Sequence, residues 1–391
     1  KVLISMQTHY IMKKILYFSV LFCGFEVNAM KKRVLLIVLV FVLGLTGCAS
    51  QGVSITPMEV PVETARDDET GISNELYLCY AKDGHVIVAN IISDSHRDDG
   101  QGIAQNPETW TEGLYILSDD GEGYTRYGIS GNRSVYDAVP YDEGILCVTY
   151  AWADNASGSS DADYRWELIY HDGREEQLMD GGYTSYEALP QITLMGEAPV
   201  YISENNTAVT RSVTVRTIED GSPRVIKDFD GYGFNDEISS NAVAYCFEIY
   251  EPHVLQPVLC AGNMDGIFLE KELEKWCNSY GVTGDRIICS QGKKLGNNTV
   301  LGISLDGGDD ITFEKAKWWF NITSGDDKTC LAVDSISTIY SIDIENASIE
   351  PLELPGGYED QWLTKSKVLG GDSGGGYVVL VDNKELYSLQ L

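Results

Sequence analysis

Tryptophan and aspartate side chains recur in long connecting segments of this chain, and they are the strongest candidates for chemistry. Two segments, Ser93–Gly113 and Ala151–Arg165, hold most of them. Flat aromatic rings beside carboxylates suit the binding of sugar rings or cationic groups. The candidate ligand-binding residues are Asp98, Asp99, Trp110, Trp152, Asp161, Asp163, Trp319 and Trp362.

Other interpretations of these residues stay open. Clustered carboxylates in a long loop also suit calcium, which takes six to eight oxygen ligands. The chain has no calcium-loop spacing such as D-x-[DN]-x-D-G, so an ordinary solvated loop explains the acids as well. The tryptophans can equally serve as packing. Calcium therefore remains an alternative, and no other metal or cofactor is expected.

One glycine-rich segment looks catalytic but lacks its partners. Residues 371–375 read Gly-Asp-Ser-Gly-Gly, which resembles the nucleophile segment of chymotrypsin-like proteases and also fits G-x-S-x-G. An α/β-hydrolase needs its histidine after the serine, and the last histidine is His253. The histidines upstream of Ser373 lie in contexts unrelated to a chymotrypsin-like site. We expect a turn here and assign no catalytic residue.

Six hairpin signals set the expected fold. Each is an acidic residue followed by glycine or asparagine between two apolar runs, and glycine tolerates the positive φ that tight hairpin turns need. The acids are Asp120, Asp172, Asp220, Asp265, Asp306 and Glu345, spaced by 52, 48, 45, 41 and 39 residues. Most hairpins follow a second pair of extended runs, which indicates repeating four-stranded units. Radial repetition of such units predicts an all-β chain folded as a single β-propeller.

We expect about seven blades, starting near residues 73, 134, 184, 233, 278, 319 and 357, with six as the alternative. We letter the strands of a blade A to D in chain order and expect them to run from the outside of the ring inward. The last unit stops at Leu391 after its C strand, and an unpaired edge promotes aggregation. We therefore expect Val53–Val60 to supply the missing D strand. B–C and D–A connections open on one face of a propeller, so the eight candidate residues should surround one mouth of its channel.

Repeated cysteines indicate packing rather than disulfides. The chain has nine cysteines, of which seven follow Cys48, and no C-x-x-C pair. An odd number argues against a full disulfide framework. A shared place in the apolar B runs predicts core positions for Cys147, Cys246, Cys289 and Cys330.

The N-terminal region resembles the signal of bacterial lipoproteins. Met30 is followed by Lys31-Lys32-Arg33, twelve apolar residues (34–45) and Leu45-Thr46-Gly47-Cys48. A basic head, a short apolar stretch and small residues before a cleavage point are typical of a secretory signal. Leu-Thr-Gly-Cys resembles the lipobox, which implies a diacylated Cys48 as the mature N-terminus.

This resemblance gives the expected organisation. Residues 1–29 are an upstream mis-start, 30–47 the lipoprotein signal peptide, 48–72 the lipidated cysteine and a polar tether, and 73–391 the propeller. The implied location is the extracytoplasmic face of a cell membrane or outer membrane, held by a lipid anchor.

The charge of the chain excludes one class of partner. The formal net charge is −31, and removal of residues 1–47 deletes six basic residues and one acid, leaving about −36. Such an excess repels phosphate backbones, so we expect no nucleic-acid binding. The expected function is a ligand-binding or protein-assembly module for a carbohydrate, a peptide or a protein. The alternative is a carbohydrate-active hydrolase or lyase with carboxylates on the same face, and the sequence favours the binding module.

Overall fold

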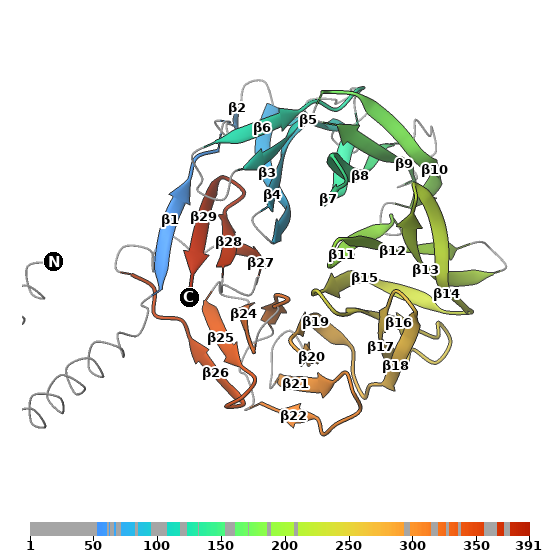
Figure 1. Cartoon of the computed structure of the whole chain (residues 1–391), viewed down its shortest axis with the longest axis vertical. Helices are drawn as coiled ribbons and strands as arrows, with labels where there is room; N and C mark the ends of the chain where they lie inside the picture. Colours follow the sequence, from blue (N-terminus) through green and yellow to red (C-terminus); the bar gives the residue numbers. More distant parts are fainter. Residues whose placement is uncertain are drawn as a thin grey trace, which may run out of the picture. The chain divides into compact units, whose positions relative to one another are not determined.

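The computed structural model describes residues 53–391, except for 61, 63–65, 68–71, 83–84, 95–107, 118–122, 132, 153–160, 171, 186–188, 207–209, 293–297, 314–319, 326–327, 335–337, 356–365 and 371–375. This described part consists of strands and their connections, without a helix. Seven antiparallel sheets form a ring (Figure 1), which confirms the all-β propeller with seven blades and not six.

Blades 1 to 4 follow in chain order, each with its A strand innermost (Figure 1), so the expected outside-to-inside order of A to D is wrong. Blade 1 contains β2 (Arg66–Asp67), β3 (Ile72–Lys82), β4 (His85–Asp94), β5 (Glu108–Leu117) and β6 (Tyr124–Tyr127). Blade 2 contains β7 (Ser134–Tyr141), β8 (Gly144–Trp152), β9 (Asp161–Tyr170) and β10 (Glu175–Ser185). Blade 3 contains β11 (Gln191–Met195), β12 (Ala198–Asn206), β13 (Arg211–Glu219) and β14 (Ser222–Asp230). Blade 4 contains β15 (Gly233–Ser240), β16 (Tyr245–Tyr250), β17 (Pro257–Asn263) and β18 (Gly266–Glu272).

Blades 5 to 7 complete the ring. Blade 5 contains β19 (Cys277–Thr283), β20 (Arg286–Gln291), β21 (Thr299–Ser304) and β22 (Ile311–Thr312). Blade 6 contains β23 (Phe320–Ile322), β24 (Thr329–Asp334), β25 (Ile339–Asp343) and β26 (Ser348–Pro351). Blade 7 contains β27 (Ser366–Gly370), β28 (Gly376–Val381), β29 (Glu385–Gln390) and, from the other end of the sequence, β1 (Ser54–Met58).

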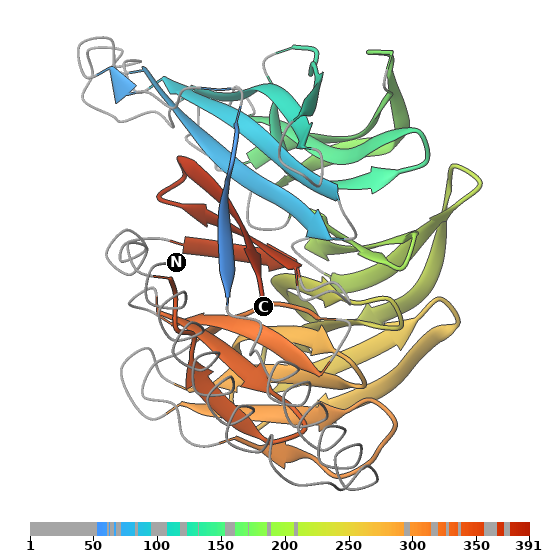
Figure 2. The same cartoon turned by 60° about the vertical axis from the view of Figure 1, so that its left-hand side comes forward.

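The last blade is closed by the N-terminal strand. β1 pairs antiparallel with β29 in register Ser54↔Gln390 to Met58↔Leu386. Both views show β1 beside the C-terminal strands (Figures 1 and 2). The predicted closure by Val53–Val60 is confirmed, because β1 covers the edge that β29 would otherwise expose.

The hydrophobic core lies between neighbouring blades. Each of the seven interfaces has its own cluster of buried side chains, such as Ile87 and Leu114 against Ile145 between blades 1 and 2. Both faces of a B strand are covered, so these strands read as continuous apolar runs. The four B-strand cysteines are fully buried there and all seven described cysteines are free thiols, as predicted.

The acidic-glycine pairs form C–D turns wherever the structure describes them. Asp220 and Gly221 have φ angles of 49° and 70° between β13 and β14, and two consecutive positive φ angles define a primed hairpin turn. Asp172, Asp265, Asp306 and Glu345 occupy the equivalent turns, whereas Asp120 lies outside the described residues.

Two predicted blade starts differ from the described strands. The first described strand of blade 7 begins at Ser366 and not near 357. The third blade starts at Gln191 and not near 184, because β10 continues to Ser185 through register shifts between Gln177 and Gly182. The register shifts interrupt the alternation of inward and outward side chains along β10. In the sequence, the end of β10 therefore resembles the first strand of a new blade.

The membrane-anchoring predictions lie outside the described part of the chain. Residues 1–52, including Cys48, are among the residues not described. Within the part that is described, no helix combines the length and apolarity that a membrane crossing requires.

Candidate functional site

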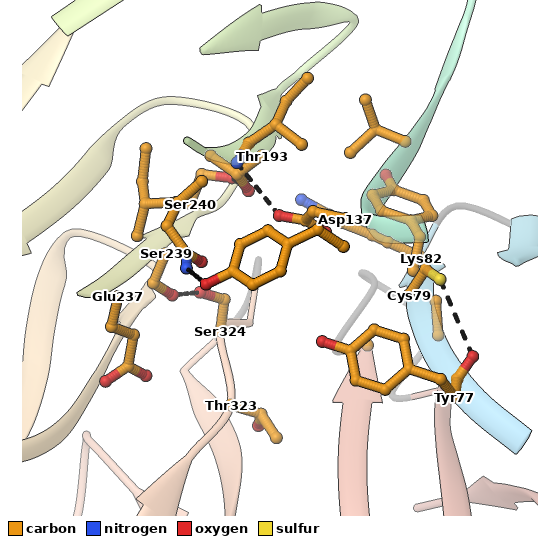
Figure 3. A pocket seen from close by; sticks show the side chains of 18 of the residues that line it. Tyr77, Cys79, Lys82, Asp137, Thr193, Glu237, Ser239, Ser240, Thr323 and Ser324 are labelled. Carbon is orange, nitrogen blue, oxygen red and sulfur yellow. Dashed lines mark hydrogen bonds between the residues drawn. The ribbon is translucent and has the colours of Figure 1, made fainter. Parts of the chain in front are cut away.

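A cavity of about 460 Å³ occupies the centre of the ring (Figure 3). It is lined by the A strands of six blades or by residues just after those strands, and its size falls in the range of small-molecule sites. Its polar and aromatic lining residues are Tyr77, Tyr80, Lys82, Tyr136, Asp137, Gln191, Thr193, Glu237, Ser239, Ser240, Thr323 and Ser324. No single blade forms this site, so it exists only in the closed ring.

Paired hydroxyl groups fix part of the lining. Ser240 Oγ donates a hydrogen bond to the carbonyl oxygen of Leu194 (2.5 Å) and lies 2.7 Å from Thr193 Oγ1. Because Ser240 has one proton to donate, Thr193 is the donor in that second bond. Ser239 and Ser324 form another hydroxyl pair, and Ser324 Oγ accepts the backbone N–H of Val282 (3.2 Å). These bonds tie blades 3 to 4 and 4 to 6 around the cavity.

Asp137 links the A strands of blades 2 and 3. Its Oδ1 accepts the N–H of Ala138 and its Oδ2 accepts the N–H of Ile192, both at 3.0 Å. A second hydrogen bond joins the same two strands, because Gln191 Nε2 donates to the Tyr136 hydroxyl at 2.7 Å. Both carboxylate oxygens of Asp137 are therefore engaged by backbone amides.

Glu237 is a half-buried carboxyl group in the cavity lining. Ser279 Oγ donates to its Oε1 (3.1 Å), while Ser279 accepts the N–H of Ile322 (3.1 Å). Burial raises the pKa of Glu237 from 4.5 to about 8, and the nearby Glu248 carboxylate adds to the rise, whereas the Ser279 hydrogen bond lowers it. Glu237 is therefore largely protonated at neutral pH and lines the cavity as a neutral acid.

Glu248 lies behind Glu237 and outside the cavity lining. It is fully buried, and its Oε2 accepts Asn235 Nδ2 (3.1 Å) and the N–H of Cys277 (3.2 Å). Burial raises its pKa to about 7, against the effect of these two hydrogen bonds. It influences the site through its charge and has no surface in the channel.

Aromatic rings connect the channel to one edge of blade 2. Tyr136 in the lining meets Tyr150 edge-on (ring centroids 6.3 Å apart), and Tyr150 meets Trp152 in the same way (5.7 Å). Trp152 ends β8, so this aromatic row runs from a B–C connection to the channel wall.

The strand registers place part of the predicted site at one end of blades 1 and 2. Trp110 lies near the start of β5, opposite Ile92, and Trp152 ends β8 opposite Ala162. Asp161 begins β9, with Asp163 two residues further. Trp110 and Trp152 are half-buried. Four other predicted residues lie outside the described part of the chain, namely Asp98, Asp99, Trp319 and Trp362.

Asp163 serves an internal ion pair. The guanidinium of buried Arg133 donates to Asp163 Oδ2 (3.0 Å), to Thr149 Oγ1 (3.0 Å) and to two backbone carbonyls. Thr149 in turn donates to Glu167 (2.6 Å). This network fastens the start of blade 2 to its B and C strands, and it gives Asp163 a structural role in the described structure.

The sequence interpretation missed the residues of the channel. Asp137 and Glu237 interrupt the A-strand sequences SVYDAVPY and GFNDEISS. A charged residue within the innermost strand of a propeller must face either the channel or a neighbouring blade. A charged residue in an A strand therefore indicates a residue of the channel or of a blade interface, but only when the A strands themselves are known.

The described residues hold no cluster of three or more His, Cys, Asp or Glu side chains arranged to bind a metal. The loops to which calcium was assigned lie largely outside the described residues, so that assignment stays a prediction.

Comparison with known proteins supports the fold. No protein-family model and no curated protein matches the chain. An oligogalacturonate lyase from Vibrio parahaemolyticus is similar over 87% of this chain and 98% of its own, with 10% identity and a TM-score of 0.51. A chain in the crystal structure of the mitotic checkpoint complex is similar over 88% and 94%, with 8% identity and a TM-score of 0.50.

The chain is also similar to part of a longer protein. The acylaminoacyl peptidase of Pyrococcus horikoshii is similar over 83% of this chain, with 9% identity and a TM-score of 0.47, and this chain spans 58% of that protein. Identities of this size show a common fold and nothing about activity.

Proposed function

We propose that this protein is a lipid-anchored, extracytoplasmic β-propeller that binds a small polar ligand in its central channel. One observation carries the proposal: six blades together line a cavity of about 460 Å³ with polar and aromatic side chains. Concave sites with a few fixed polar groups are the usual form of small-molecule sites.

The channel is a better site than the blade 1 and 2 edge. On that edge Asp163 is committed to Arg133, and Trp152 packs against Tyr150. Trp276, another tryptophan at a D–A connection, packs against Tyr250 with ring centroids 4.9 Å apart. These contacts favour packing over ligand binding for the described tryptophans. Docking of a protein partner through the acidic surface is the competing binding role.

A carbohydrate-active hydrolase or lyase is the second candidate. Glu237 favours it, because a carboxyl group with a pKa of about 8 can act as a general acid. Hydrolysis of a glycosidic bond ordinarily needs a second carboxylate beside the first. Asp137 has both oxygens on backbone amides and Glu248 lies outside the lining. The described geometry therefore supports binding more directly than catalysis.

The channel site is testable by filling it. Ser239→Tyr adds a ring inside the cavity, and Val225→Tyr adds the same ring on exposed β14 as the matched control. The full chain, purified in detergent micelles, is screened for ligand-induced increases in melting temperature with mono- and oligosaccharides, short peptides and calcium. We expect the increase to vanish in Ser239→Tyr and to persist in Val225→Tyr and Trp152→Ala. Loss of the increase in Trp152→Ala alone would place the site on the loop edge instead.

The anchor is tested separately at Cys48. Metabolic labelling with a palmitate analogue in a bacterial host should label the wild-type chain and leave Cys48→Ser unlabelled, because the thiol is the only acceptor in the lipobox. The wild-type chain should fractionate with membranes and Cys48→Ser should not. An unlabelled wild-type chain would refute the anchor and leave the channel proposal untouched.

A further inference from the structure

We infer that the channel ligand is a neutral polyhydroxylated molecule of the saccharide class, and not an ion. This inference rests on the function proposed above and names the ligand class for the same site. It follows from the charge, the hydrogen-bonding groups and the aromatic surface of the lining.

The formal charges of the cavity lining sum to about zero at neutral pH. Its charged side chains in the described structure are Lys82, Asp137 and Glu237. Glu237 is held largely in its neutral form, and Asp137 is balanced by two backbone N–H donors. Lys82 and Asp137 cancel in formal charge. Because these two formal charges sum to zero, the lining as a whole attracts neither sign of ion, and an ion would lose its hydration free energy on entering.

Hydroxyl and amide groups dominate the polar lining. Thr193, Ser239, Ser240 and Ser324 come from three wall segments, in blades 3, 4 and 6, and Gln191 adds a carboxamide. Hydroxyl groups both donate and accept hydrogen bonds, as do the hydroxyl groups of sugars. The protonated Glu237 adds a donor that a carboxylate could not supply. Thr193 and Ser240 already donate their protons within the wall, so they offer a ligand acceptor oxygens, and the protonated Glu237 supplies the donor. This mixed set of acceptors and a donor matches a polyol better than it matches a purely donating or accepting ion.

Aromatic rings complete the match. Tyr77, Tyr80 and Tyr136 all line the cavity, from blades 1 and 2. Figure 3 labels Tyr77 among the lining side chains. Tyrosine has an apolar ring face and a polar hydroxyl at its tip. A sugar ring is likewise apolar on its faces and polar at its rim, so the two can stack and hydrogen-bond at once. Tyr136 is held in place by Gln191 and Tyr150.

Ionic ligands meet specific obstacles. An anion would have to approach a chain of net charge −31, which repels it at long range. A cation would be attracted to the surface, but inside the cavity both oxygens of the Asp137 carboxylate already accept backbone N–H groups. Both Glu237 and Glu248 have raised pKa values because they are desolvated.

Matched saccharides test the inference by isothermal titration calorimetry on the full chain in detergent micelles. The neutral probes are galactobiose, cellobiose and N,N′-diacetylchitobiose. The charged counterparts are digalacturonate and the deacetylated, diamine form of chitobiose. We expect at least one neutral probe to bind about tenfold or more tightly than its charged counterpart. Preference for a charged probe, or no binding by any neutral probe, overturns the inference.

Glu237 variants supply the second readout. Glu237→Gln keeps the size and hydrogen-bonding capacity of the protonated acid, so a neutral ligand should bind within about threefold of wild type. Glu237→Ala removes the group and should weaken binding by about tenfold. If Glu237→Gln instead weakens binding as much as Glu237→Ala does, the carboxylate charge is required and the inference fails. Melting temperatures and circular dichroism verify that each variant folds.

The failure of this inference differs from the failure of the proposed function. Tight binding of a charged probe that Ser239→Tyr abolishes would keep the channel as the site and reject the neutral class. Binding of any probe that Ser239→Tyr leaves unchanged would reject the channel itself.

Discussion

Glu237 shows how a single side chain can take its properties from the ring. Its sequence neighbours, Asn235 and Ile238, give no hint of a raised pKa. The rise comes from desolvation inside the channel and from Glu248 on the adjacent B strand. The Ser279 hydrogen bond comes from the next blade. Assembly of blades 4 and 5 therefore creates the neutral acid that the proposed site uses.

The raised pKa of Glu237 makes stability depend on pH. The folded pKa of about 8 lies above the ordinary 4.5, so the folded state favours the protonated form. The stabilisation is complete below about pH 4.5 and is lost as the pH rises through about 8. We expect Glu237→Gln to gain roughly 1–3 kcal/mol over wild type in unfolding free energy between pH 5 and pH 8.

Urea denaturation at several pH values measures this effect. Glu350→Gln, on exposed β26, is the matched control and should follow the wild-type pH dependence. Glu248 also has a raised pKa and contributes a dependence of the same sign in every variant, so the comparison uses the difference between variants. Parallel curves for Glu237→Gln and wild type would contradict a desolvated Glu237.

Arg133 is expected to be the costliest charge to remove. Its guanidinium is buried and makes four hydrogen bonds, so Arg133→Met would leave Thr149 and two backbone carbonyls without a donor and leave Asp163 with Arg165, 3.9 Å away. We expect a loss of about 1–3 kcal/mol in unfolding free energy, as for other buried acceptors that lose their donor. Arg174→Met breaks an exposed pair with Asp172 and should change stability little. Equal effects of the two substitutions in chemical denaturation would refute the structural role of Arg133.

At the scale of strands, closure of the ring depends on β1. Deletion of Ser54–Met58 would expose the edge of β29 and uncover Leu386 and Leu389. We expect the deleted chain to melt at a lower temperature and to aggregate, because an open edge pairs with other chains. A synthetic peptide of residues 53–60 should restore the melting temperature by adding the strand in trans. Unchanged melting after the deletion would show that β1 does not close the ring.

Strands and turns could be predicted where each one carries its own local signal. B strands are covered on both faces, so runs such as that of β8 are apolar throughout, and the C–D turns need residues that accept positive φ. The start of blade 3 could not be predicted, because the register shifts in β10 depend on pairing with β9. The turn at Ser304–Gly308 also follows local rules, with Gly308 N–H bonded to Asp306 and Ser304.

At the scale of the molecule, the ring creates a site that no segment of sequence contains. The tryptophan and aspartate segments stand out in the sequence because they are long and unusual in composition. The channel residues do not, since each is one polar residue in a short strand. Only the ring brings Tyr136, Gln191 and Glu237 around one cavity. Their convergence depends on blade number and closure, which local patterns specify only in part.

The net charge acts at the same scale. A charge of −31 over the whole chain keeps polyanions away, and the prediction that nucleic acid does not bind rests on it. The channel differs from this surface because Lys82 offsets Asp137 and Glu237 is protonated. A neutral ligand can therefore be selected inside a strongly acidic protein.

A crystal structure of the full chain with the tightest-binding saccharide tests the central claim most directly. We predict ligand density inside the ring, between Tyr136 on blade 2 and Glu237 on blade 4. Density confined to the loop edge near Trp110 and Trp152, with an empty channel, would contradict it.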